Sequence, residues 1–330
     1  MTEPPLPVVT VLCAGPDDRP AHFDGLADRA TFVFTDATGL PDAIEDADVL
    51  VLWDFFSRAV ADAWPRAKRL QWIHVCAAGV DKLLFEELRA SAVVVTNARG
   101  IFDGPIAEFV LASVLAHTKL LAESTRLQQA HAWRHRETRR LAGQRALVVG
   151  TGAIGREIGR LLTAVGVRVD GAARAARDDD PDFTRVIASS DLAAHAADYD
   201  VIVNAAPLTE ATRGLLDRDV FDAVKPGVHL VNVGRGETVD EDALLAALRA
   251  GRVGAASLDV FATEPLPADH PLWDEPGVAI SAHMSGDVVG WLDALALQVV
   301  DNLERWLDGR PLLNVVDKRL GFVPSGDRSG

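Results

Sequence analysis

Short apolar runs recur along almost the whole chain, separated by stretches with the residue spacing of amphipathic helices. Within each run the apolar residues are continuous rather than alternating, which is typical of a strand buried on both faces of a parallel sheet. The runs are residues 8–13, 31–34, 48–53, 70–75 and 92–96, then residues 145–150, 167–172, 200–205, 228–233, 255–260 and 278–281. The predicted fold class is therefore α/β, with two doubly wound parallel-sheet domains.

The domain boundaries follow from two long helical patterns. With 330 residues the chain is long enough for two cores, because single cores rarely grow beyond about 250 residues. One predicted helix, residues 105–124, bridges the two series of strands, and a second, residues 288–307, can return the chain to the first domain. We expect residues 1–99 and 285–330 to form a flavodoxin-like substrate domain, and residues 100–284 a Rossmann dinucleotide-binding domain.

Charge and composition exclude several classes of partner. A net charge of -15 repels phosphate backbones and anionic membranes, so neither nucleic acid nor membrane is an expected partner. The N-terminal MTEPPLPVV lacks the basic and long apolar regions of a signal peptide, which predicts a cytoplasmic protein. Cys13 and Cys76 have no metal-ligand spacing and are too few for a disulfide framework, so we assign them no chemistry and expect no metal.

A glycine motif marks the start of the second series of strands. In VVGTGAIGREIGRLL, Gly150, Gly152 and Gly155 follow an apolar strand and open an amphipathic helix. The first glycine permits a tight turn, the second lets the backbone approach a pyrophosphate, and the third allows close packing of helix on strand. A glycine-rich turn without a ligand is the alternative for an isolated match. The strand before the motif and the helix after it favour a dinucleotide site, which includes Thr151, Ala153 and Ile154.

Three further segments follow later strands of the same domain: NAAPLTEAT (204–212), VNVGRG (231–236) and LDVFATEPLP (258–267). Together with the glycine motif and AAGVD (77–81), they resemble the D-isomer-specific 2-hydroxyacid dehydrogenases, in particular the glyoxylate/hydroxypyruvate reductase-like members. The resemblance runs from about Leu70 to His283, with the motifs in the order and spacing of that family. It implies reduction of a 2-oxo acid to a D-2-hydroxy acid with NAD(P)H.

Such a reduction needs a cation for the substrate carboxylate and an acid for the developing alkoxide. The resemblance implies that Arg235 holds the carboxylate, that His283 donates the proton and that Glu264 binds the other imidazole nitrogen. A carboxylate beside an imidazole favours the imidazolium, so the histidine can act as an acid near neutral pH. Taken singly, Arg235 is more typical of a surface ion pair and Glu264 of an exposed loop, but the three occur together, each after a predicted strand.

Further contacts are implied by the same resemblance. Backbone amides at Ala78 and Gly79 complete the carboxylate site, and Asp259 holds the nicotinamide carboxamide. Thr209 or Thr212 contacts the ribose or a phosphate. The other cofactor contacts expected from the strand ends are Ala206, Pro207, Val233 and Gly234.

The choice between NAD and NADP depends on VDGAARAAR (169–177). An NAD-selective fold places an acid about 20 residues beyond the glycines, and that place falls at Ala173. Arg174 and Arg177 follow, and guanidinium groups there suit the 2′-phosphate of NADP. We therefore predict a preference for NADPH, with residues 178–180 forming a solvated acidic loop. The alternative is that both arginines point into solvent and either cofactor is used.

Aromatic residues suggest the chemistry of the substrate side chain. Trp53, Phe55 and Phe56 end the predicted strand DVLVLW, and Trp291 follows the histidine closely. They suit an apolar or aromatic 2-oxo acid such as phenylpyruvate, with simple core packing as the equal alternative. The residue before the histidine is Ala282, where the family commonly has proline, so the rim of this pocket departs from the family pattern.

Three other classes of protein are alternatives to this assignment. Formate dehydrogenases pair their histidine with glutamine, unlike Glu264, and phosphite dehydrogenases carry a lysine where Ala78 stands, so both are disfavoured. A non-catalytic NAD(P)H-sensing protein of the same fold is the alternative from another class. The family also predicts a homodimer, in which residues 105–141, including Trp133, pack on a partner.

Overall fold

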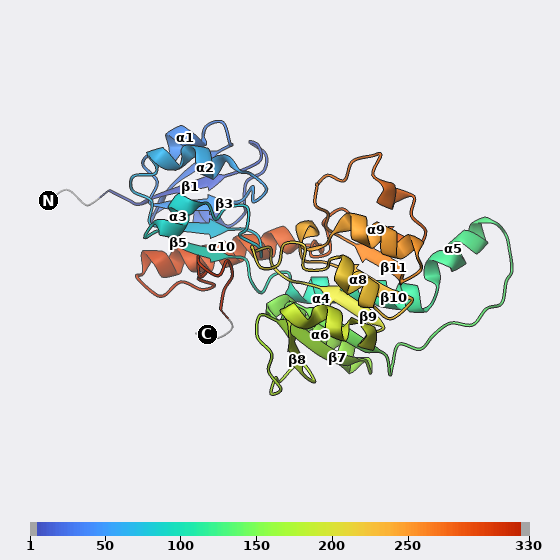
Figure 1. Cartoon of the computed structure of the whole chain (residues 1–330). Coiled ribbons are helices and arrows are strands. Elements are labelled where there is room, and N and C mark those ends of the chain that lie inside the picture. The colour runs from blue at the N-terminus through green and yellow to red at the C-terminus, as the bar shows by residue number, and fades with distance from the viewer. Residues whose placement is uncertain (1–4, 325–330) are drawn as a thin grey trace. The chain divides into compact units, whose positions relative to one another are not determined.

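The computed structural model describes residues 5–324, which divide into two compact units (Figure 1). Unit 1 contains the residues up to Ile101 and those from Val288 onward, and unit 2 contains Phe102–Asp287. The boundaries expected from the sequence, at 99/100 and 284/285, lie a few residues earlier. Each unit has its own parallel sheet, and the prediction of an α/β protein with two such sheets is confirmed.

Unit 1 has a five-stranded sheet in the order β2-β1-β3-β4-β5, in which all pairings are parallel. This is the flavodoxin-like order. The strands are β1 (Val8–Leu12), β2 (Thr31–Thr35), β3 (Val49–Leu52), β4 (Trp72–Val75) and β5 (Val94–Asn97). The helices are α1 (Leu40–Ala43), α2 (Ala59–Ala63), α3 (Glu86–Ala90) and α10 (Trp291–Leu307), whose Leu295, Val299 and Leu303 are fully buried.

Unit 2 has a seven-stranded parallel sheet in the order β12-β11-β10-β9-β6-β7-β8. Counted from β6, the order 3-2-1-4-5-6 of a Rossmann fold is present, with β12 added at one edge. The strands are β6 (Arg145–Val149), β7 (Arg168–Ala173), β8 (Val186–Ala188), β9 (Val201–Asn204), β10 (Val228–Asn232), β11 (Val253–Leu258) and β12 (Val278–Ile280). The helices are α4 (Asp103–Thr118), α5 (Leu121–Gln129), α6 (Ala153–Ala164), α7 (Leu192–His195), α8 (Arg218–Ala223) and α9 (Glu241–Arg249).

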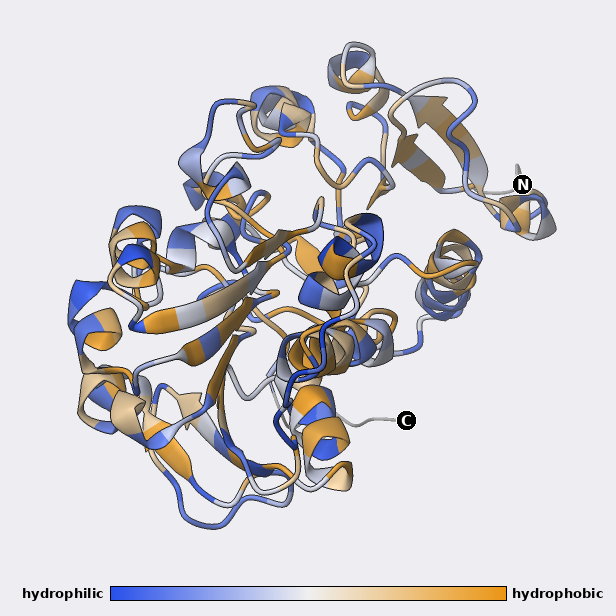
Figure 2. Ribbon diagram, turned by 90° about the vertical axis from the view of Figure 1, so that its right-hand side faces the viewer, coloured by the Kyte–Doolittle hydropathy of each residue, from blue (hydrophilic) through white to orange (hydrophobic). Residues whose placement is uncertain are grey.

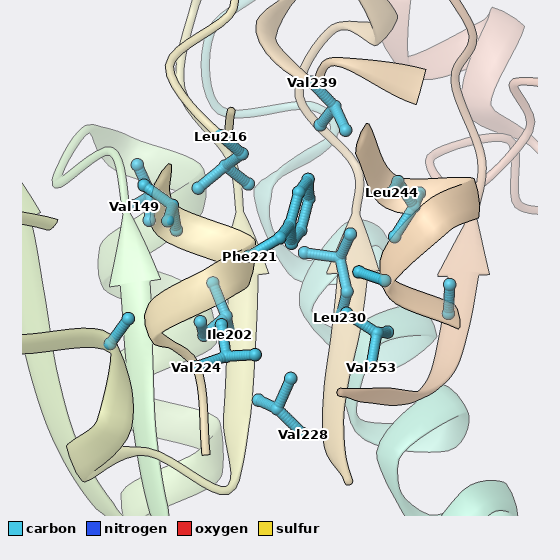
Figure 3. Close-up of a cluster of buried hydrophobic side chains, with 14 of the residues drawn as sticks. Val149, Ile202, Leu216, Phe221, Val224, Val228, Leu230, Val239, Leu244 and Val253 are labelled. Carbon is cyan, nitrogen blue, oxygen red and sulfur yellow. The ribbon is translucent and has the colours of Figure 1, made fainter. Parts of the chain in front are cut away.

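The strands of each sheet are mostly apolar, and the helices carry polar residues on their outer faces (Figure 2). In unit 2 the core between the sheet and the helices α8 and α9 is built from aliphatic residues around Phe221 (Figure 3). Ile202 and Leu230, from neighbouring strands, are at most 3% exposed in this cluster. Removing these side chains from water is the main stabilising contribution of the sheet, and it fixes the strand ends that carry the site.

The prediction of a single helix over residues 105–124 is wrong. It is divided into α4 and α5 at Lys119–Leu120, because Leu120 adopts a left-handed conformation with φ 55°. The chain therefore turns by 61° between the two helices. From α5 onward it runs out from the rest of unit 2 before it returns to β6 (Figure 1).

Within residues 5–324 no single helix is long and apolar enough to cross a membrane, although the bent pair of α4 and α5 passes on length and composition alone.

Candidate active site

The glycine motif forms a tight turn between β6 and α6. Gly150 has φ 98°, and a Cβ atom there would lie 2.7 Å from the carbonyl oxygen of Ala205, which follows β9. A Cβ atom on Gly155 would lie 1.8 Å from the carbonyl oxygen of Gly150. The turn thus lies where the strand order reverses, between β6 and β9, and helix α6 begins there with exposed backbone N–H groups. These features fit the pyrophosphate of a dinucleotide.

The turns that follow β9 and β10 lie against each other beside this loop. A Cβ atom on Gly234 would lie 2.7 Å from the carbonyl oxygen of Ala206, so a side chain there would separate the two turns. The hydroxyl of Thr212 donates to the carbonyl of Pro207 at 2.6 Å and accepts from the backbone N–H of Thr209 at 2.8 Å. Both threonines therefore shape their own loop, and Val233, after β10, is buried.

A buried polar network beneath these turns was not predicted. Asn204 at the end of β9 donates to Asn232 at the end of β10 at 2.9 Å, and to Thr238 at 2.6 Å. Thr238 in turn donates to the backbone carbonyl of Arg235 at 2.5 Å, so the network supports the turn that carries this arginine. The three residues are at most 2% exposed. The signal in the sequence was an asparagine at the end of each of two neighbouring strands.

His283 and Glu264 form a hydrogen-bonded pair in the structure. Nδ1 of His283 lies 2.8 Å from Oε2 of Glu264, and the two side chains are 32% and 25% exposed. The other carboxylate oxygen of Glu264 accepts from the backbone N–H of Phe261 at 3.0 Å. The imidazole is thus oriented through one nitrogen by a carboxylate that is itself oriented by the backbone.

Asp259 organises the turn around His283. Its carboxylate accepts from the hydroxyl of Ser281 at 2.5 Å and from the backbone N–H groups of Met284 and Ser285 at 3.0 Å each. Its backbone carbonyl accepts from the N–H of His283 at 2.8 Å. His283 has φ 51°, which a residue other than glycine adopts only when the surrounding structure holds it there. The nicotinamide contact expected from Asp259 stays a prediction.

Arg235 lies in the turn after β10 and is partly buried. Its Nη1 donates to the carbonyl of Gly234 at 2.8 Å. At the next residue, a Cβ atom on Gly236 would lie 1.8 Å from the carbonyl carbon of Phe261. The turn that carries Arg235 therefore packs backbone to backbone on the loop that carries Glu264, and the structure brings these two segments and His283 to the same edge of the sheet.

The loop after β7 differs from the expected solvated acidic loop. Asp180 has a side chain that is 1% exposed, and it accepts from Arg156 at 2.9 Å and from Arg177 at 2.8 Å. Burial raises the pKa of Asp180, but hydrogen bonds from Arg156, the Asp182 backbone and Arg177 outweigh it and lower the value to about 2. The prediction of a solvated carboxylate is wrong for this residue, because two arginines neutralise it.

The same cluster fixes Arg177 beside the glycine loop. Its Nη2 donates to the hydroxyl of Thr151 at 3.1 Å, and its backbone pairs with Val186 of β8. Arg174 is exposed, and its side chain makes no hydrogen bond or ion pair with the described part of the chain. Ala173 ends β7, as expected. Of the two predicted arginines, Arg174 is thus the one whose guanidinium is available to a ligand.

The predicted substrate residues of unit 1 lie on two loops. The carbonyl of Ala78 accepts from Asn97 Nδ2 at 2.6 Å, which ties the loop containing Gly79 to the end of β5. Trp53 is 6% exposed and its indole N–H donates to Asp18 at 3.0 Å, so it is largely packed inside the unit.

The other aromatic residues after β3 form a cluster of their own. Phe55 contacts Phe56 at 4.6 Å and Trp291 at 6.3 Å between ring centroids, and Phe56 is 52% exposed. The amine of Lys82 lies 4.9 Å from the centre of the Phe56 ring. Phe56 therefore presents an apolar surface that Trp53 does not.

A Rossmann unit that carries a carboxylate–histidine pair at its strand ends fits a nicotinamide-dependent dehydrogenase. The chain belongs to the D-isomer specific 2-hydroxyacid dehydrogenases, since residues 111–285 match the NAD binding domain of that family. It is an NAD(P)-dependent D-2-hydroxyacid dehydrogenase, and the sequence-based assignment to this class is confirmed.

Individual relatives have related names. The chain is 31% identical over 250 residues, 75% of its length and 78% of the other's, to a glyoxylate/hydroxypyruvate reductase A of Arabidopsis thaliana. It is 29% identical over 301 residues, 90% of each chain, to the hydroxyphenylpyruvate reductase of Plectranthus scutellarioides. The NADPH-dependent glyoxylate/hydroxypyruvate reductase of Sinorhizobium meliloti, solved with NADP and sulfate, superposes with a TM-score of 0.83 at 26% identity, covering 96% of this chain and 100% of the other.

Proposed function

We propose that the protein reduces a 2-oxo acid to the D-2-hydroxy acid, with His283 as the proton donor, Glu264 as its partner and Arg235 as the carboxylate ligand. The observation that carries the proposal is the 2.8 Å contact between Nδ1 of His283 and Glu264, which orients the imidazole through that nitrogen; Nε2 is the proposed donor. The bound nicotinamide supplies the hydride.

Each residue has one step in this mechanism. Arg235 binds the substrate carboxylate, which places the neighbouring carbonyl carbon for attack. As that carbon gains the hydride, Nε2 of His283 gives its proton to the carbonyl oxygen, which becomes the hydroxyl group. Glu264 stabilises the charged imidazole before transfer and keeps the remaining proton on Nδ1 afterwards. The expected roles of Ala78, Gly79 and Trp53 in substrate binding stay predictions.

The test is a panel of glyoxylate, hydroxypyruvate and phenylpyruvate with NADPH and NADH, followed at the nicotinamide absorbance. Turnover is the expected result, and the predicted aromatic contacts with the substrate side chain favour higher kcat/KM with phenylpyruvate than with glyoxylate. Much faster reduction of glyoxylate contradicts the aromatic preference. Cofactor binding without turnover of any acid favours the non-catalytic sensor.

We also propose that NADPH is preferred and that Arg174 binds its 2′-phosphate. In the double variant Ala173→Asp, Arg174→Ala, the preference in kcat/KM should shift toward NADH by about 10- to 100-fold, because a charge-assisted contact is replaced by a repelling carboxylate. The change should lie mainly in the KM for NADPH, because the phosphate is remote from the hydride.

The matched control is Arg168→Ala, which removes an exposed arginine from the opposite end of β7 and should leave the preference unchanged. A wild-type enzyme that favours NADH, or a double variant with the wild-type preference, contradicts the proposed role of Arg174.

We also propose that the protein is a homodimer, in which the segment that runs out from unit 2 contacts the second copy. In that segment Trp133 is fully exposed, and Leu121 on α5 is 52% exposed. A second copy of the chain is the proposed cover for these apolar side chains. Light scattering at micromolar concentration should report twice the mass of one chain, and a monomer at that concentration rules the proposal out.

A further inference from the structure

Glu241 holds the loop that carries Glu264. It is the first residue of α9, and its side chain is 20% exposed. Its Oε1 accepts from the backbone N–H of Ala262 at 2.8 Å, although the two residues are 21 positions apart in the chain. Ala262 lies between the end of β11 and Glu264. A carboxylate from a neighbouring helix thus anchors this loop at one backbone group.

The N–H group that orients Glu264 belongs to the peptide directly before the anchored one. The N–H of Phe261, one residue before, donates to Oε1 of Glu264 at 3.0 Å, and Oε2 of the same carboxylate faces His283. On its other side the Phe261–Ala262 peptide is covered by Gly236, where a Cβ atom would lie 2.2 Å from the nitrogen of Ala262. A continuous chain of contacts therefore leads from Glu241 through this peptide to the imidazole.

His270, from a third segment of the chain, lies beside Glu241. Its Nδ1 accepts from the backbone N–H of Leu272 at 3.4 Å, so Nε2 is the nitrogen that carries the proton. Nε2 lies 3.6 Å from Oε2 of Glu241. The carboxylate of Glu241 therefore has one hydrogen bond, from Ala262 to Oε1, and His270 as the neighbour of Oε2.

We propose that Glu241 is a positioning residue for the proton donor: it fixes the Phe261–Ala262 peptide and so holds Phe261, whose own N–H aligns Glu264 with His283. The proposal rests on the proposed function, because it assumes that the Glu264–His283 pair performs the proton transfer. Without the Glu241 carboxylate the N–H of Ala262 loses its acceptor in the protein, so the loop is held at one point fewer. Glu264 then holds the protonated imidazole less well, and the acid form of the donor is lost at lower pH.

Two other charged residues near His283, Asp287 and Asp259, are unaltered when Glu241 is replaced. Burial raises the pKa of the Asp287 carboxyl, an effect that His283 opposes and Asp259 increases. Neither of these acids contacts Glu241 among the described residues, and Asp259 holds the turn after His283. Replacing Glu241 therefore leaves the contacts of these two acids in place.

The experiment compares the pH dependence of kcat/KM for 2-oxo acid reduction in four single variants and one double variant of the full-length protein. In Glu264→Gln the alkaline limb should move to lower pH, because the imidazolium loses its carboxylate. In Glu241→Ala it should move in the same direction but less far, since the carboxylate is present but less well aligned. Glu241→Gln keeps an acceptor oxygen for Ala262 and should restore most of the wild-type profile.

Asp242→Ala is the matched control, because it removes an exposed acid from the same turn of α9 and should leave the profile unchanged. Circular dichroism checks that every variant folds. An NMR titration of the His283 ring in cofactor-free protein repeats the comparison without turnover. In the Glu264→Gln background, Glu241→Ala should produce no further shift, because both changes act through one carboxylate.

Two results overturn the inference alone: a Glu241→Ala profile that does not move while that of Glu264→Gln does, or a Glu241→Gln variant that shifts as far as Glu241→Ala. The second result would indicate an effect of charge rather than of position. A Glu264→Gln profile identical to that of the wild type overturns the proposed function itself, so the two failures are distinguishable.

Discussion

Replacement of His283 by alanine is expected to lower kcat for 2-oxo acid reduction by about three orders of magnitude, within the range typical of a lost general acid. The substrate oxygen would then have to take its proton from water. The affinity for the dinucleotide should change little, because the glycine turn of residues 150–155 lies at β6 and α6 rather than at the histidine turn. Stopped-flow turnover and calorimetric titration of NADPH measure the two quantities separately.

The matched control for this prediction is His195→Ala, which removes a histidine from α7 of the same unit. Its kcat and its affinity for NADPH should equal those of the wild type. The kcat of Glu264→Gln should lie between those of His283→Ala and His195→Ala, because this variant keeps the imidazole but loses the carboxylate that orients it. Wild-type turnover in His283→Ala would rule out the proposed proton donor.

The sequence alone was sufficient to predict the sheets and the edge on which the site lies. Continuous apolar runs identify buried parallel strands, and the glycine turn after β6 identifies the point where the strand order reverses. Arg235 and His283 directly follow such runs, so their position at the carboxyl ends of the strands could be predicted from the pattern. That each side chain performs the assigned step remains a proposal.

The contacts that hold these residues could not be predicted in the same way. The Glu241–Ala262 and Asp180–Arg156 hydrogen bonds each join residues more than 20 positions apart, and which loop atoms meet depends on how the helices pack. The break at Leu120 was missed because it depends on a backbone conformation that the apolar spacing does not report. Strand β8 was not predicted, although β12, which also has three residues, was.

Arg235→Ala is expected to lower kcat/KM for the 2-oxo acid by about a thousandfold, mainly through a higher KM for the acid and also through slower turnover. The guanidinium is fixed before substrate binds, because Nη1 donates to Gly234 at 2.8 Å and the backbone carbonyl accepts from Thr238 at 2.5 Å. A preorganised planar fork can donate two parallel hydrogen bonds to a carboxylate. Its loss removes both the binding energy and the alignment of the neighbouring carbonyl.

Two further variants sharpen this test. Arg235→Lys keeps the charge but not the fork, so it should recover only part of the lost kcat/KM. Arg218→Ala, which removes an exposed arginine from α8, should behave as the wild type. Steady-state kinetics with the acid varied at saturating NADPH separates KM from kcat, and the Kd for NADPH should be the same in all three variants. An Arg235→Ala enzyme with an unchanged KM for the acid would show that another group binds the carboxylate.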